Sequence, residues 1–113
     1  MSNFECVYYY LKVGGVLARG CELGTQFLVE EGSTVAKRIK KAGTYSRLRE
    51  KLCKKGVIKN GRFAKSYTFT SPTQAGNVIL GTKGGGPANW LNDRGVSLTV
   101  ARKHRANNES MNP

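Results

Sequence analysis

Basic side chains are concentrated in the middle of this sequence, where they could bind an anion. The 113-residue chain has nineteen lysines and arginines against seven acidic residues, a formal net charge of +12. In the segment 37–65, Glu50 is the only acidic residue. The basic residues of this segment are Lys37, Arg38, Lys40, Lys41, Arg47, Arg49, Lys51, Lys54, Lys55, Lys59, Arg62 and Lys65. Such a one-signed surface suggests an anionic partner, most commonly a polyphosphate. A solvated face that only aids solubility is the alternative.

Three of these basic residues share one side of a helix predicted over residues 44–55. Arg47, Lys51 and Lys54 recur at i, i+4 and i+7, so they lie on one face, with Arg49 flanking the opposite, apolar face. That apolar face consists of Tyr45, Leu48 and Leu52. The sequence has no helix-turn-helix, zinc-finger or RNA-binding aromatic motif, so the pattern indicates phosphate contacts rather than base reading.

Residues that could catalyse a reaction or hold a metal are few and scattered. The only histidine is His104, and the three cysteines, Cys6, Cys21 and Cys53, form no C-x-x-C pair. We therefore expect no catalytic triad, metal, cofactor or disulfide framework, and we interpret Cys21 and Cys53 as small packing residues. The acidic residues form no motif that would hold magnesium for a nuclease. We therefore expect a non-catalytic protein. Because the sequence shows no signal peptide and no long apolar run, we expect it in the cytoplasm.

The stretch Ser71–Trp90, SPTQAGNVILGTKGGGPANW, raises the question of a glycine loop that binds phosphate. Such a loop leads from a strand into a helix N-terminus. Here the glycines come after the predicted helix instead. Ser71 is a suitable N-cap, Pro72 fits the first helical position, and Gln74 completes a capping box. Gly81 is placed to end the helix. The glycines are therefore interpreted as turns.

Trp90 allows two interpretations. Packed beside Leu98 and the Ser71-capped helix, it would fill the core, as a single tryptophan most often does. On the surface, it would instead offer a ring on which a nucleic-acid base could stack.

The elements expected to position these residues make a small antiparallel sheet with two short helices, an α+β fold. Aromatic and β-branched runs between glycines predict strands at Phe4–Val13, Val16–Glu22, Thr25–Glu31, Phe63–Phe69 and Val96–Val100. Gly14-Gly15 predicts a turn between the first two strands, and Asn60-Gly61 predicts a hairpin after Val57-Ile58. The helices are expected from a Thr44 cap to Gly56, and over Thr73–Leu80.

The predicted domain organisation is simple. Residues 1–100 are expected to form one compact domain, with residues 34–42 as a basic loop. Residues 101–113 are polar and basic and lack an apolar period, so a disordered tail is expected there.

Four stretches of the chain form a recognisable pattern: VLARGCELGTQFLVEEGSTVA, LREKLCKKGVI, YTFTSPTQAGNVILG and NWLNDRGVSL. Together they resemble a small bacterial and phage domain of unknown function that usually follows a GIY-YIG endonuclease domain. The positions that match the family pattern are Ala18-Arg19-Gly20, Phe27, Val29, Gly32-Ser33, Ser71-Pro72-Thr73, Ala75, Leu80-Gly81, Trp90 and Gly95-Val96-Ser97-Leu98. The serine-proline helix and the tryptophan ending are shared with the RAMA domain, which accompanies restriction enzymes and adenine methylases.

The resemblance implies an accessory DNA-binding module whose nuclease or defence partner is supplied in trans. Two positions depart from the family pattern. Gly76 replaces a second alanine, and the run from Gly85 to Asn89 replaces an Asn-Gly pair before the tryptophan, so we expect a differently shaped loop. The alternative function is a phage-encoded inhibitor or decoy that blocks a host defence nuclease or captures a nucleotide signal.

Overall fold

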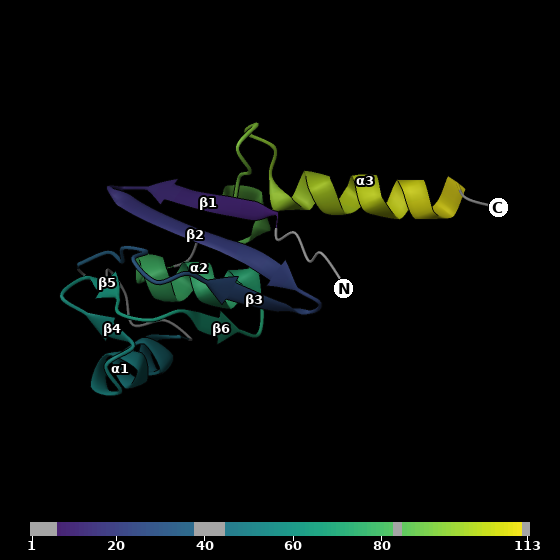
Figure 1. Cartoon of the computed structure of the whole chain (residues 1–113). Coiled ribbons are helices and arrows are strands. Elements are labelled where there is room, and N and C mark those ends of the chain that lie inside the picture. The colour runs from purple at the N-terminus through teal and green to yellow at the C-terminus, as the bar shows by residue number, and fades with distance from the viewer. Residues whose placement is uncertain (1–6, 38–44, 83–84, 112–113) are drawn as a thin grey trace, which may run out of the picture.

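Four antiparallel strands form the main sheet of an α+β domain, and helix α2 packs against one face of it (Figure 1). The structure is a computed structural model and describes residues 7–37, 45–82 and 85–111. The sheet order is β1-β2-β3-β6, with strands Tyr8–Val13, Val16–Leu23, Gln26–Val29 and Tyr67–Phe69. A separate hairpin pairs β4 with β5, which are Ile58–Lys59 and Arg62–Phe63. The α+β class and the antiparallel sheet are as predicted.

Strands β1 and β2 join through a two-residue turn at Gly14-Gly15, where the sequence predicted a turn. The two glycines have φ of 54° and 84°, a backbone region that glycine reaches without steric cost. The turn pairs Val13 with Val16 and so sets Leu11 opposite Ala18. Leu11 and Ala18 are fully buried. The turn therefore fixes which face of β1 and β2 enters the core.

The stretch predicted as one strand, Phe63–Phe69, is divided between the two sheets. Its first residue belongs to β5, which pairs with β4 around the predicted Asn60-Gly61 turn, and its last three form β6 beside β3. Phe63 and Phe69 are both buried, and their ring centroids lie 6.1 Å apart in an edge-to-face contact. The break lets the chain change sheets while both rings stay in one core.

Helix α2 (Pro72–Leu80) begins and ends at the predicted residues. Ser71 Oγ accepts a hydrogen bond from the Gln74 backbone N–H at 3.1 Å. Gln74 Oε1 in turn accepts from the Thr70 N–H at 3.0 Å, one residue before the cap. Gly81 ends the helix in the left-handed conformation, with φ of 69°. These contacts satisfy backbone groups that a helix end leaves unpaired.

Helix α1 (Ser46–Lys54) lies beside β4 and α2. The residue before it is Tyr45, whose side chain makes no capping hydrogen bond. The predicted cap, Thr44, lies outside the described residues. Leu52 is buried as expected, and Gly56 ends the helical region with φ of 77°.

The chain ends in a third helix, α3 (Leu98–Met111), so two predictions for this region are wrong. Val96–Val100 is not a strand, and the chain from Ala101 to Met111 is helical where a disordered tail was expected. Ser97 supplies the missed start signal, because its Oγ accepts from the Val100 N–H at 3.2 Å. The helix projects from the sheet at the end of the molecule opposite α1 (Figure 1).

Candidate nucleic-acid interface

Exposed basic side chains gather at the α1 end of the molecule. We call these residues of α1, the β4–β5 hairpin and the adjoining segments the basic surface; they are Lys37, Arg47, Lys51, Lys54, Lys55, Lys59, Arg62 and Lys65. Helix α1 and β4 are in contact, which brings the two groups of basic residues side by side (Figure 1). Three further predicted members, Arg38, Lys40 and Lys41, lie outside the described residues.

The exposed side of α1 carries a shallow basic groove of about 520 Å³. It is lined by Arg47, Glu50, Lys51, Lys54 and Lys55. The carboxylate of Glu50 lies 3.2 Å from the Lys54 ammonium, but both side chains are mostly exposed, so this pair contributes little to stability. The groove keeps a net positive charge, and its side chains can turn toward an anion without breaking a buried contact.

The other ion pairs of the described residues lie away from the basic surface. Glu30 lies 2.7 Å from Arg19 on the sheet, and its hydrogen bond from Arg19 holds the pKa of the Glu30 carboxyl below its usual value. Glu22 of β2 receives hydrogen bonds from Arg102 and Arg105 of α3 at 2.8 and 2.7 Å. Burial alone would raise the pKa of Glu22, but these two arginines outweigh it and lower the pKa. Carboxylates therefore offset part of the arginine charge on the sheet and on α3.

Arg49 is buried, which corrects its placement among the phosphate-binding residues. Its side chain is only 7% exposed. Nη1 donates to the carbonyls of Val78 and Ile79 at 3.1 and 3.4 Å, and Nη2 donates to the carbonyl of Ala36. The first two carbonyls belong to the last turn of α2, where the helix dipole favours a cation. Burial lowers the pKa of the guanidinium. Arg49 thus joins α1 to the end of α2.

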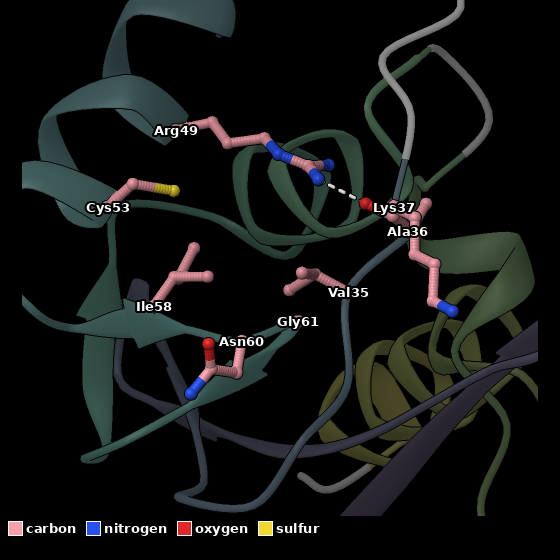
Figure 2. A pocket seen from close by; sticks show the side chains of 8 residues that line it. All are labelled: Val35, Ala36, Lys37, Arg49, Cys53, Ile58, Asn60 and Gly61. Atoms are coloured by element: carbon pink, nitrogen blue, oxygen red, sulfur yellow. Dashed lines mark hydrogen bonds between the residues drawn. The ribbon is translucent and has the colours of Figure 1, made fainter.

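A pocket of about 460 Å³ opens next to Arg49, between α1, β4 and the segment before residue 38 (Figure 2). Its lining residues are Val35, Ala36, Lys37, Arg49, Cys53, Ile58, Asn60 and Gly61. Figure 2 shows Cys53 extending from α1 above Ile58, and Arg49 extending from the same helix to the carbonyl of Ala36. Cys53 is exposed, so its interpretation as a packing residue is wrong, whereas Cys21 is buried as expected. The pocket was not predicted, because its walls come from separate segments of the chain.

Trp90 belongs to the core, which decides between its two interpretations. The ring is fully buried and meets Phe27 edge to face, with centroids 4.7 Å apart. Its Nε1 donates to the carbonyls of Pro72 and Gly85 at 3.2 and 3.0 Å. Because no ring face is open to solvent, a base cannot stack on Trp90 in this structure.

The glycines after α2 serve packing. Gly85 donates its N–H to Asn77 Oδ1 at 3.0 Å and lies directly on Gly76. A Cβ placed on Gly76 would come within 2.0 Å of the Gly85 carbonyl oxygen. Gly85 is therefore seated on the side of α2, after the helix rather than at its start. Lys83 and Gly84 lie outside the described residues.

Groups suited to metal chemistry are not brought together in the part of the chain that the structure describes. There, no three residues of the types His, Cys, Asp and Glu are placed to hold a metal ion. Over the same residues, no helix is both long enough and apolar enough to cross a membrane.

Comparisons with known proteins place the chain in a family. Neither the curated proteins nor the solved structures contain a match. A family model, described as Domain of unknown function (DUF4357), matches residues 9–102. The matched region runs from β1 into α3 and contains the basic surface, the pocket beside Arg49 and the buried Trp90. The chain therefore belongs to the family described as Domain of unknown function (DUF4357).

Proposed function

We propose that this protein is a non-catalytic module that binds nucleic acid, DNA in particular, mainly through phosphate contacts with its basic surface. The observation that carries the proposal is the separation of charge in the fold. Of the ion pairs formed by described residues, only the exposed Glu50–Lys54 pair lies on the basic surface. When lysines and arginines without carboxylate partners neutralise the phosphates of a polyphosphate, the counterions condensed on that polyphosphate are released, which favours binding.

The shape of the basic surface also suits a phosphate backbone. Helix α1 presents Arg47, Lys51 and Lys54 along one exposed side, and the neighbouring hairpin adds Lys59 and Arg62. Long, exposed side chains at this spacing can follow a strand of phosphates without reading its bases. The binding that we propose is accordingly tolerant of sequence.

The biological setting is proposed from the sequence resemblance. Because similar domains follow GIY-YIG endonuclease domains and share motifs with the RAMA domain, we place this module beside a nuclease or a restriction system that acts in trans. The module would then supply DNA affinity to a partner that supplies the chemistry.

The test is to measure binding of the purified protein to duplex DNA, single-stranded DNA and RNA over a range of salt concentrations. About four to six phosphate contacts predict a slope of roughly −4 to −5 in a plot of log affinity against log salt for duplex DNA. Similar affinities for unrelated duplex sequences are expected as well. Failure to bind any nucleic acid at low salt would contradict the proposal and favour the inhibitor or decoy function.

A further inference from the structure

The pocket beside Arg49 differs chemically from the basic surface that surrounds it. Val35 and Ile58 form its deeper walls and are only 6% and 5% exposed. The aliphatic side chains and the Cys53 thiol make this a mostly apolar slot (Figure 2). Its volume of about 460 Å³ falls within the range of small-ligand sites, roughly 300–1,000 Å³.

The charge of the lining indicates an anionic occupant. Lys37 and Arg49 contribute positive charge, and none of the described residues that line the pocket is acidic. Arg49 hydrogen-bonds backbone carbonyls, and its guanidinium has no carboxylate partner among the described residues. An occupant that combines a flat, weakly polar ring with a phosphate would match apolar walls beside the Lys37 ammonium and the Arg49 guanidinium. Guanidinium groups also stack well on nucleobases.

The position of the pocket indicates where such an occupant would come from. Lys37 of the basic surface lines the pocket, and so do Asn60 and Gly61, which lie between Lys59 and Arg62 in the β4–β5 hairpin. A phosphate backbone that lies along this side of the basic surface therefore passes the pocket. We infer that the pocket receives the base of one unpaired nucleotide of the bound nucleic acid, with the nucleotide's phosphate at Lys37. This inference rests on the proposed function.

The first test uses the Cys53 thiol as a reporter of the pocket. Cys6 lies outside the described residues and is replaced by serine, and Cys21 is buried, so a thiol-reactive disulfide reagent reports on Cys53. A duplex with a single-nucleotide bulge should slow the reaction at Cys53 on the order of tenfold, because an unpaired base avoids the cost of extrusion. The fully paired duplex, bound at saturation, should slow it much less.

The outcomes of this test separate the two proposals. If the paired duplex binds but the bulged duplex gives no added protection, the pocket inference is overturned while phosphate binding stands. If neither duplex binds at low salt, the proposed function fails first. If a free nucleoside monophosphate slowed the reaction at Cys53 and the bulged duplex did not, the inference that the base belongs to a bound strand would also be overturned.

The second test fills the pocket. The readout is the ratio of affinities for bulged and paired duplexes, expected to be about tenfold or more in the wild type. Cys53→Phe should bring this ratio close to one, because the ring occupies the slot, whereas Cys53→Ala should preserve it. Circular dichroism establishes that both variants are folded. A ratio unchanged in the folded Cys53→Phe protein would overturn the inference.

Discussion

At the scale of single residues, Gly76 and Gly85 explain why this chain departs from the pattern that it resembles. The resemblance implies alanine at the position of Gly76 and a different loop before the tryptophan. In the structure, the two glycines form a backbone-to-backbone contact, which a Cβ on either residue would block. The carbonyl of Gly85 also receives the Trp90 indole N–H. Gly76 and Gly85 therefore depend on each other in this structure, because a side chain on either residue would displace the loop from α2.

We predict that Gly76→Ala lowers the free energy of unfolding by about 1–3 kcal/mol, as overpacking does. Alanine would otherwise favour the helix, so the sign of the effect tests the close contact. Gly86→Ala is the matched control, because its Cβ would meet only Thr73 Oγ1, at 3.7 Å. Chemical denaturation of the two variants provides the measurement. A Gly76→Ala protein more stable than the wild type would contradict the packing described here.

Trp90 gives a second prediction at this scale. Trp90→Ala should cost about 3–5 kcal/mol of stability, since a fully buried ring is replaced by a cavity. Trp90→Phe should cost less, because it keeps an aromatic ring against Phe27 while leaving the carbonyls of Pro72 and Gly85 without their indole donor. Thermal and urea unfolding measure both losses. An alanine variant with an unchanged melting temperature would show that the ring is not part of the core.

At the scale of elements, short sequence motifs correctly predicted those features of the fold that depend on contacts between residues close together in the chain. The capping box and Gly81 located α2, and Gly14-Gly15 and Asn60-Gly61 located two turns. Helix α3 was missed because its sequence has little apolar periodicity, and two of its arginines pair with Glu22, far away in the chain. The Arg47, Lys51 and Lys54 face of α1 followed from helical spacing. Burial of Arg49 and the pocket beside it depend on packing between segments, which periodicity does not encode.

The attachment of α3 predicts a dependence of stability on pH. In the folded state the two arginines hold the pKa of Glu22 below its ordinary value, so the contribution of this cluster to stability is fully present above that ordinary pKa. The contribution is lost as the pH falls through the lower pKa of the folded state. Because both arginines are substantially exposed, solvent screening limits it to about 1 kcal/mol.

Glu22→Gln should therefore remove part of the loss of stability in acid and speed hydrogen exchange in α3 at neutral pH. Glu31→Gln, at an exposed position, is the control. Denaturation midpoints between about pH 3 and pH 7 provide the measurement, a range that spans the usual glutamate pKa. Identical acid profiles for wild type and Glu22→Gln would show that this cluster does not hold α3.

At the scale of the whole molecule, the net charge of +12 is divided unequally between two ends. Carboxylates pair with arginines on the sheet and on α3 and offset part of their charge, whereas the α1 end keeps its cations almost unopposed. Net charge alone would attract a polyanion to any part of the protein. If binding instead depends on phosphate contacts at a defined surface, only the charges that touch phosphates contribute to the salt dependence of the affinity.

Two triple variants with the same loss of charge separate these possibilities. Replacing Arg47, Lys51 and Lys54 with glutamine should weaken binding to every duplex alike and flatten the salt slope by about 2–3, about 0.9 for each lost phosphate contact. The control replaces Lys12, Arg94 and Lys103, which are exposed on β1, on the loop after Trp90 and on α3. It should leave the slope close to that of the wild type. Circular dichroism checks that both proteins fold. Equal flattening in both variants would mean that net charge, rather than the basic surface, governs binding, and an unchanged slope in the first would place the phosphate contacts elsewhere on the molecule.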